Sequence, residues 1–421
     1  MKVGILTYHI VCNFGAQLQA ISTVGFLKRE GHEPVVINWY PKDLDEKYQK
    51  EIPLEQYKCH IDFAKQNMPL TKLCRTEDEL LQVIEENNFD AIILGSDALF
   101  KFLPKSARKI FSFRKLRFVD RCIFTSDQEL AGNPFWGSFI PKLKNAIPVV
   151  VFSVSSQNTA YKKVNEQEYD GVKKSLERFK YITVRDEWTK QLVQYFLGKI
   201  DIPVTPDPVF SFNQNTYLPV LSKQKLIEKY KLPNKYVLLS FRLKRIGELF
   251  VKEIADRLIA NGYTPVAFPH PEGLEDYGCA HKISMPLSPL EWYYLIKYSD
   301  GYIGERMHPI IVSLHNTVPF FCFDEYGMTK IIKIFPYIYF KKLFWKSSKI
   351  YHILSKADLL DNVVSIKHLP KITPQMAVER FLTFDKQKVS VFLEKQQQEY
   401  ENYMNNLLEH CSSQKQSFNN K

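Results

Sequence analysis

The sequence predicts an α/β protein of two domains, each built around a mainly parallel sheet. Short apolar runs alternate with longer segments of helical spacing over most of the 421 residues, as in successive strand–helix–strand units. A stretch richer in proline and asparagine, residues 206–234, interrupts this alternation near the middle of the chain. The length also suits two ordinary domains better than one.

The first half of the chain carries one series of strand and helix signals. The candidate strands are the short apolar runs at residues 3–6, 34–38, 90–95, 148–154, 181–184 and 202–205. Apolar residues at helical spacing predict a helix over 16–29, which Gly31 terminates. A similar pattern predicts a helix over 166–179, directly before the strand at 181–184. This order of elements predicts a Rossmann-like domain over residues 1–212.

The alternation starts again after the proline-rich stretch. The candidate strands of this half are residues 236–241, 265–268, 282–285, 301–304 and 318–323. The candidate helices are residues 246–261, 289–298 and 307–314, followed by one long polar helix over 374–409. We therefore expect a second Rossmann-like domain over 213–372, and a long C-terminal helix with a frayed tail over 373–421. Two such halves, with a terminal helix that reaches back over the first, describe the GT-B architecture.

The chain is basic, and part of its positive charge lies in two segments that also contain aromatic residues. The formal net charge is +11, which suits an anionic partner such as a phosphorylated substrate or an acidic membrane surface. Residues 101–121 and 335–346 mix lysine or arginine with aromatic side chains. This mixture is typical of a surface that contacts lipid headgroups, and equally of a solvated basic face with core aromatics behind it. No helix-turn-helix, zinc-finger or stacking-sheet signature favours nucleic acid.

Other features of the sequence bear on compartment and cofactor. The apolar run at residues 1–6 is too short for the core of a signal peptide, and no run of about 18 apolar residues predicts a membrane-spanning helix. Seven scattered cysteines without a C-x-x-C pair are typical of reduced thiols in a cytoplasmic protein. No cluster has metal-ligand spacing, so we expect neither a metal nor a cofactor.

Ligands of open parallel sheets bind beyond the carboxyl ends of the strands, so the residues that follow each strand are the candidate site residues. After the first strand, His9, Asn13, Gly15 and Gln17 form a polar turn in which glycine permits close backbone approach to a ligand. The same pattern is typical of an asparagine cap before an ordinary helix. It is neither a dinucleotide-binding fingerprint nor a phosphate-binding P-loop.

Two further strand ends carry small polar residues. Ser96 and Asp97 follow the third candidate strand, where the carboxylate suits a sugar hydroxyl or a helix cap. Ser155 follows the next strand, where a hydroxyl suits an anion or a turn without any ligand. We expect all three residues to contact substrate.

The most informative strand ends are two that resemble each other. Arg185 ends one strand in the first half, and Arg306 follows another in the second half, next to Glu305 and His308. An arginine beside a helix N-terminus offers a forked donor for phosphate or carboxylate, and histidine titrates near neutral pH. Taken singly, Arg185 is more often the partner of a local acid such as Asp186. Together they predict a small-anion site between the two halves, with Glu305 at its edge.

These strand ends, taken together, resemble the polysaccharide pyruvyl transferase family. The matching stretches are Asn13-Phe-Gly-Ala-Gln-Leu-Gln, Gly95-Ser-Asp, Ser153-Val-Ser, Val184-Arg-Asp-Glu, Asp207-Pro-Val-Phe, Arg306-Met-His and Asn316-Thr-Val-Pro. They follow the family's order over roughly residues 1–330. The chain departs from the family at residues 98–100, Ala-Leu-Phe, where glutamine and tryptophan are common. Residues 331–421 carry no stretch that matches.

The resemblance implies an enzyme that transfers a pyruvyl group from phosphoenolpyruvate, as a cyclic ketal, to two hydroxyls of one sugar of a bacterial surface polysaccharide. It implies that Arg185, Arg306 and His308 bind the donor and catalyse the reaction, His308 as acid and base. His9 and Asp97 are candidates for the acceptor side. Such polysaccharide repeats are commonly built on a lipid carrier, so a cytoplasmic enzyme at the inner face of the membrane is expected.

Two alternatives share this architecture. A nucleotide-sugar glycosyltransferase also uses two such domains and a basic cleft, and Glu305 could then hold ribose hydroxyls. Arg306 and His308 beside it suit a small anion better. A catalytically silent protein that binds polysaccharide or lipid carrier is the other alternative, against which the retained Arg185, Arg306 and His308 argue.

Overall fold

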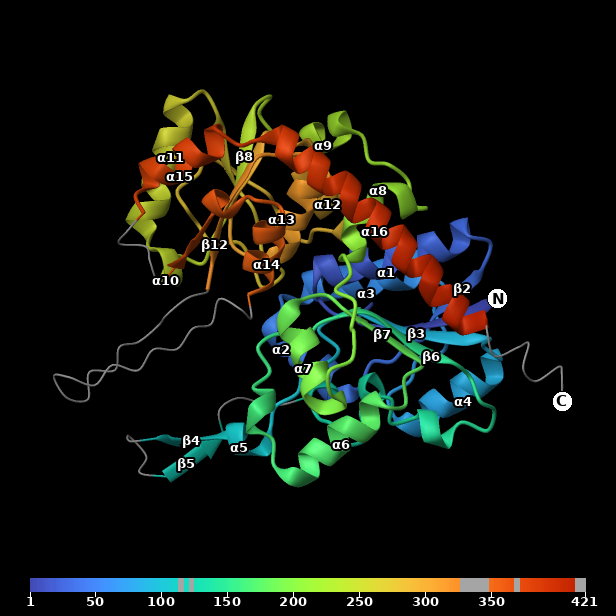
Figure 1. Ribbon diagram of the computed structural model, residues 1–421. Coiled ribbons are helices and arrows are strands. Elements are labelled where there is room, and N and C mark those ends of the chain that lie inside the picture. The colour runs from blue at the N-terminus through green and yellow to red at the C-terminus, as the bar shows by residue number, and fades with distance from the viewer. Residues whose placement is uncertain (113–116, 121–124, 326–347, 367–371, 413–421) are drawn as a thin grey trace.

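The computed structural model describes residues 1–112, 117–120, 125–325, 348–366 and 372–412, and it contains two parallel sheets (Figure 1). The first sheet has the order β2 (Glu33–Val36), β1 (Lys2–Leu6), β3 (Ala91–Asp97), β6 (Val149–Val154) and β7 (Tyr181–Val184). The second has the order β10 (His281–Lys282), β9 (Thr264–Ala267), β8 (Tyr236–Ser240), β11 (Gly301–Gly304), β12 (Phe320–Asp324) and β13 (Val363–Ser365). The predicted α/β class with two mainly parallel sheets is confirmed.

The central strands are buried along their whole length because helices cover both faces of each sheet. Every residue of β3 and β6 is buried, as expected for strands inside a parallel sheet. The helices that follow the strands of the first sheet are α1 (Phe14–Arg29), α2 (Lys42–Glu51), α3 (Leu54–Asn67), α4 (Glu77–Asn87), α6 (Glu166–Leu176) and α7 (Glu187–Leu197). Those of the second half are α9 (Lys223–Tyr230), α10 (Leu243–Ile246), α11 (Glu248–Ala260), α12 (Pro289–Tyr298), α13 (Met307–His315) and α14 (Lys349–Lys356).

Helix α1 lies where the two halves meet. Asn13 caps it by accepting hydrogen bonds from the N–H groups of Gly15 and Ala16. All residues from Phe14 to Leu27 are buried, because the helix contacts α12 and α13 of the second half as well as its own sheet. The ring of Phe14 stacks on Trp292 of α12, with 5.2 Å between the ring centroids. The N-terminus of α1 therefore faces the second half of the molecule.

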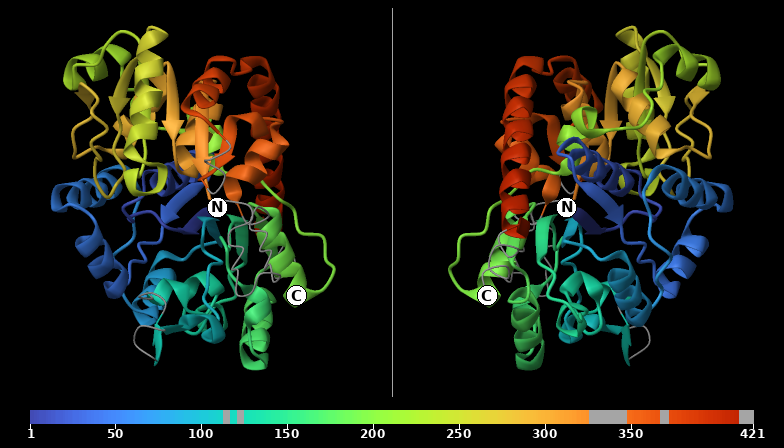
Figure 2. Two further views of the ribbon diagram at one scale, coloured as in Figure 1. Left: turned by 90° about the vertical axis from the view of Figure 1, so that its left-hand side faces the viewer. Right: turned by 90° about the vertical axis from the view of Figure 1, so that its right-hand side faces the viewer.

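The C-terminal segment folds back over the first half, as predicted (Figures 1 and 2). It forms two helices, α15 (Pro374–Leu382) and α16 (Lys386–Ser412), where the sequence predicted one. The break follows from Asp385, whose carboxylate accepts hydrogen bonds from the N–H groups of Gln387 and Lys388 and so starts a new helix. Tyr400 of α16 packs edge-on against Phe26 and Phe152, at 5.6 Å from each ring.

Several predicted elements need correction. The strand predicted at 202–205 reduces to one bridge between Val184 and Val204, since Pro203 lacks an N–H to donate. The strand at 282–285 contributes only the two residues of β10. The helix at 246–261 is divided at Gly247, where φ is +94°. The helix at 166–179 ends at Leu176.

Of the two basic aromatic segments, the structure describes only the first in part. Residues 335–346 lie outside the described residues. In the other segment, α5 (Lys105–Arg108) leads into an antiparallel hairpin of β4 (Lys109–Ser112) and β5 (Arg117–Asp120), which the sequence did not predict. The hairpin projects from the first half of the molecule (Figure 1). Within the described ranges, no helix has the length and apolar character needed to cross a bilayer.

Candidate active site

A cavity of about 240 Å³ lies between the two halves, at the carboxyl ends of both sheets. The first half contributes residues at the start of α1, at the end of β3 and after β6. The second half contributes residues at the end of β8, after β9, in α12, after β11 and at the start of α14. The lining residues are Asn13, Phe14, Gly15, Asp97, Gln157, Ser240, Pro269, His270, Pro271, Trp292, Arg306, Met307, His308, Pro309 and Lys349. The predicted site residues Asn13, Gly15, Asp97, Arg306 and His308 are thus brought together.

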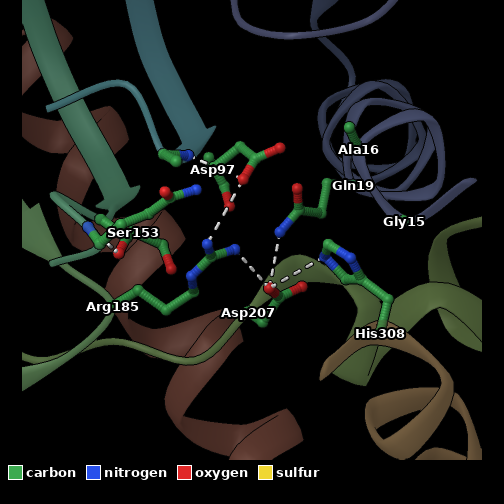
Figure 3. Close-up of polar contacts among 12 residues, drawn as sticks. Gly15, Ala16, Gln19, Asp97, Ser153, Arg185, Asp207 and His308 are labelled. Carbon is green, nitrogen blue, oxygen red and sulfur yellow. Dashed lines mark hydrogen bonds and ion pairs between the residues drawn. The ribbon is translucent and has the colours of Figure 1, made fainter. Parts of the chain in front are cut away.

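A buried carboxylate, Asp207, connects the polar groups beside this cavity (Figure 3). Its Oδ2 atom accepts hydrogen bonds from Arg185 at 2.7 Å and from the side-chain amide of Gln19 at 2.6 Å. Nε2 of His308 lies 3.9 Å from the same oxygen. Oδ1 accepts from the N–H of Val209, which fixes the carboxylate at the start of a helical turn. Asp207 therefore links a residue of each half of the molecule.

Arg185 is part of the framework behind the cavity. It is 4% exposed, and its guanidinium donates to Asp207 and, at 3.4 Å, to Asp97. Burial disfavours the charge, but Asp207, Asp97 and Asp186 outweigh that effect and raise the pKa of Arg185. The sequence predicted that Arg185 and Arg306 would face each other across one anion. In the structure, Arg185 instead forms ion pairs with the buried carboxylates of Asp97 and Asp207, in place of the expected anion.

His308 lies at the start of α13 and packs against the first turn of α1. A Cβ atom added to Gly15 would lie only 2.0 Å from Cγ of the imidazole, so only glycine leaves room for this ring. Burial lowers the pKa of His308 to about 4, although Asp207 and Asp97 act in the opposite direction. The imidazole is therefore neutral near pH 7 and able to accept a proton.

Arg306 lines the cavity and is partly exposed. Its backbone φ is +79°, an uncommon conformation for a residue other than glycine, which is characteristic of functional sites. The guanidinium donates to both carboxylate oxygens of Glu272, at 2.5 and 2.6 Å, and about a third of the side chain is exposed. Because Glu272 lies in an exposed loop, this ion pair can be exchanged for a ligand more readily than those of Arg185.

Four of the residues predicted to contact substrate serve the protein framework in the structure. Both ring nitrogens of the buried His9 are engaged, with the carbonyl oxygen of Thr7 and the side-chain oxygen of Asn38. The polar groups of the other three are bonded to nearby protein groups: Gln17 to His60, Ser155 to Asp186, and Glu305 to the N–H of Arg242. Since strand-end side chains also serve to fix loops, their position in the sequence did not distinguish these roles.

Ser96 differs from these four residues. It is buried directly before Asp97, and among the described residues its hydroxyl has no hydrogen-bond partner. Its carbonyl oxygen accepts a hydrogen bond from Thr7, which joins the ends of β1 and β3. Asp97 itself has φ of +95° and accepts a hydrogen bond from the N–H of Ala98. Its pKa is lowered, because Arg185, Lys349 and His308 together outweigh the opposing effect of burial.

Several residues of the site were not identified from the sequence. Asp207 and Gln19 lie within the stretches that match the family, so their position was a usable signal, but neither was assigned a role. His270 follows β9, and Lys349 begins α14 in the region after residue 331 where no stretch matched. Only the fold brings these two residues to the cavity, so no sequence signal was available for them.

Three nitrogen atoms of the cavity lining lack hydrogen-bond partners. Among the described residues, Nε of Arg306, Nε2 of His308 and Nε2 of His270 are buried without a hydrogen bond. Buried polar groups in native proteins are nearly always satisfied by protein, water or ligand, so these nitrogens are able to bind a ligand that supplies acceptor atoms. The complementary ligand is rich in acceptor oxygens, as phosphates and carboxylates are.

Comparison with known proteins gives a family and a fold. A family model described as "Polysaccharide pyruvyl transferase" matches residues 13–325. A search of curated proteins gave no match. Many solved structures match at low identity. Glycyrrhiza uralensis UGT73P12, complexed with glycyrrhetinic acid 3-O-monoglucuronide, is 10% identical with a TM-score of 0.52, over 100% of this chain and 97% of that one.

Two epimerase structures also match. The UDP-GlcNAc 2-epimerase of Neisseria meningitidis, bound to UDP-GlcNAc, is 11% identical with a TM-score of 0.48, over 97% of this chain and 100% of that one. The UDP-GlcNAc 2-epimerase of Methanocaldococcus jannaschii is 12% identical with a TM-score of 0.46, over 94% of this chain and 92% of that one. At 10% identity, the similarity to UGT73P12, whose TM-score is 0.52, shows the fold alone, which is GT-B.

Proposed function

This chain belongs to the polysaccharide pyruvyl transferase family, and from that premise we propose that it transfers the pyruvyl group of phosphoenolpyruvate to two hydroxyls of one sugar, as a cyclic ketal. The observation that carries the proposal is the cavity between the two halves, where His308 approaches Asp207 and the nitrogens of Arg306, His308 and His270 lack partners. Phosphoenolpyruvate supplies a phosphate and a carboxylate, the acceptor groups that such nitrogens require.

The size of the cavity supports a small donor. Its volume of about 240 Å³ is below the roughly 300–1,000 Å³ of pockets that bind drug-sized ligands. Phosphoenolpyruvate has ten non-hydrogen atoms, whereas a nucleotide sugar is several times larger. Glu305, the residue that could hold a ribose, is 6% exposed and already accepts the N–H of Arg242. The site therefore favours phosphoenolpyruvate over a nucleotide sugar.

In the proposed reaction, His308 transfers a proton as general base and then general acid. As the first sugar hydroxyl forms a bond to C2 of the donor, the neutral imidazole takes the hydroxyl proton and passes it to the methylene carbon, which becomes a methyl group. The second hydroxyl then attacks C2 as the bond to the phosphate oxygen breaks, and its proton leaves with phosphate. Asp207 orients the imidazole and stabilises its charged form, and Arg306 stabilises the departing phosphate.

The acceptor side is expected to involve Asp97, which lines the cavity and is ionised near neutral pH. A carboxylate there can accept a hydrogen bond from the sugar hydroxyl that will attack. We propose a lipid-linked oligosaccharide as acceptor and a cytoplasmic enzyme at the inner face of the membrane. The support is the net charge of +11 and the basic character of the α5–β4–β5 region. Liposome flotation with and without anionic lipid tests this association.

Release of phosphate from phosphoenolpyruvate is the decisive measurement for the proposed function. The protein should release phosphate only when a suitable acceptor is present, in a panel of galactose-, mannose- and glucose-type sugars on lipid carriers. The product should gain the mass of a pyruvyl ketal. Release of a nucleotide from nucleotide sugars, without phosphate from phosphoenolpyruvate, would instead support the glycosyltransferase alternative. Acceptor binding without turnover of either donor would support a silent binding protein.

A further inference from the structure

Lys349 is a cation of the cavity that the sequence comparison does not single out. It is the first residue of α14, beyond the part of the chain that the family model covers. Its side chain is half-buried and lines the same cavity as His308, Arg306 and Asp97. The amine interacts electrostatically with Arg185, Asp97, Asp186 and Asp207, so the buried charges of the site surround it.

The other cations of the site are already engaged. Arg185 donates to Asp207 and Asp97, and Arg306 donates to Glu272. Within the part of the chain that the structure describes, Lys349 forms neither a hydrogen bond nor an ion pair shorter than 4.0 Å. Lys349 is thus a cation on the cavity that an anion can reach without first displacing a carboxylate.

The three acids around Lys349 do not fully compensate for its burial. Asp97, Asp186 and Asp207 attract the ammonium group, whereas Arg185, which pairs with Asp97 and Asp207, repels it. Burial, followed by this repulsion, outweighs the attraction and lowers the pKa of Lys349 to about 7. His308 adds no charge near neutral pH, since its own pKa is about 4. An anion bound directly beside the amine would favour the protonated form and raise its pKa.

We propose that Lys349 binds an anionic oxygen of the donor, a phosphate or carboxylate oxygen, and takes up a proton when the donor binds. This assignment rests on the proposed function, since it names a further ligand of the same donor site. It also gives the segment after the matched family region a role, because α14 delivers Lys349 to a cavity that residues 13–309 otherwise enclose.

The first experiment is a calorimetric titration of the full chain with phosphoenolpyruvate and, separately, with inorganic phosphate. Replacing Lys349 with methionine should weaken phosphoenolpyruvate binding roughly 10- to 100-fold, the loss expected for one charge-assisted hydrogen bond. Lys349→Arg should retain most of the affinity. Lys356→Met, at the exposed end of the same helix, is the matched control and should bind like the unaltered protein. Thermal unfolding verifies that each variant is folded.

The second experiment is the pH dependence of binding, which a purely structural lysine would not alter. Near pH 6 Lys349 is protonated before the donor arrives. Above pH 7 the free amine loses its proton, and affinity should fall by up to about tenfold per pH unit until the pKa of the complex is reached. Lys349→Arg should lack this fall, because guanidinium does not titrate in the range. The pH profiles of the unaltered protein and Lys349→Arg therefore test the role of Lys349 even if Lys349→Met does not fold.

The outcomes separate this inference from the proposed function. If the unaltered protein binds neither phosphoenolpyruvate nor phosphate at any pH, both are overturned. If it binds phosphoenolpyruvate, but Lys349→Met binds equally well or Lys349→Arg shows the same fall with pH, only the role of Lys349 is overturned. Weaker binding of Lys349→Met together with a flat profile for Lys349→Arg supports the assignment.

Discussion

Two arginines at corresponding strand ends, Arg185 after β7 and Arg306 after β11, have similar neighbours in the sequence and different surroundings in the structure. Arg185 is 4% exposed and lies between two buried carboxylates, Asp97 and Asp207. Arg306 has about a third of its side chain exposed, and its partner Glu272 is about half exposed. The ion pairs of Arg185 are buried, whereas the ion pair of Arg306 is partly exposed to solvent.

The same residue type at corresponding strand ends can therefore have two roles, one structural and one open to a ligand. A buried ion pair holds its geometry because breaking it leaves an unpaired charge out of water. An exposed ion pair contributes little and is easily exchanged. Arg185 therefore fixes the positions of Asp97 and Asp207, whereas Arg306 can exchange Glu272 for the proposed donor. The substitutions below test this contrast between the two arginines, and those with the greatest predicted consequences come first.

Replacing Arg185 with methionine should both destabilise the protein and abolish turnover. Removing one partner of a buried ion pair typically costs about 3–5 kcal/mol, because Asp97 and Asp207 are then left unpaired. Chemical denaturation measures the loss, with Arg306→Met as the matched control, which should change stability by less than about 1 kcal/mol. Adding Asp207→Asn to Arg185→Met should restore part of the stability. Equal losses for the two arginine variants would contradict the division.

Replacing His308 with alanine should remove turnover while donor binding persists. Loss of a general acid or base typically lowers the rate about 10²- to 10⁴-fold. Single-turnover phosphate release measures the chemical step, and calorimetry with phosphoenolpyruvate measures binding. His281→Ala, on the edge strand β10, is the control and should be fully active. Full activity of the His308 variant would refute its role in proton transfer.

The architecture could be predicted largely from the sequence, because buried parallel strands are continuous apolar runs and the helices between them have clear limits. The strands at 181–184 and 301–304 and the helix at 289–298 have the predicted bounds. The errors occur where one residue decides the outcome locally. Pro203 prevents a strand, Gly247 divides one helix, and Asp385 begins another.

The site could be predicted only in part, because the chemistry of a side chain depends on what it meets in space. The convergence of His308, Asp97 and Gly15 follows from strand ends that the sequence reveals. The sequence does not reveal that Asp207 accepts hydrogen bonds from both Arg185 and Gln19. Nor does it reveal that both ring nitrogens of His9 have hydrogen-bond partners inside the first half. These contacts join residues that are far apart in the chain, so only the folded structure determines them.

Replacing Gly15 with alanine tests whether the position of His308 matters as much as its presence. The added methyl group would lie 2.0 Å from the imidazole, so the ring has to move away from Asp207. A displacement of about 1 Å can cost roughly 100-fold in rate. Gly171→Ala in α6, where no atom lies within 4 Å of the added Cβ, is the matched control. It should stabilise the helix by about 0.4–1 kcal/mol and leave the rate unchanged.

The smallest effect is expected for Arg306→Ala, and it falls on binding. Because Glu272 is exposed, losing the ion pair should change the free energy of unfolding by less than about 1 kcal/mol. Affinity for phosphoenolpyruvate should fall about tenfold, the loss of one charged donor at a partly solvated site. Glu272→Gln is the informative partner variant, since it frees the guanidinium and should leave donor affinity equal or higher. Lower affinity in Glu272→Gln would show that Arg306 needs its carboxylate to be held in place, as Arg185 does, and the contrast between the two arginines would disappear.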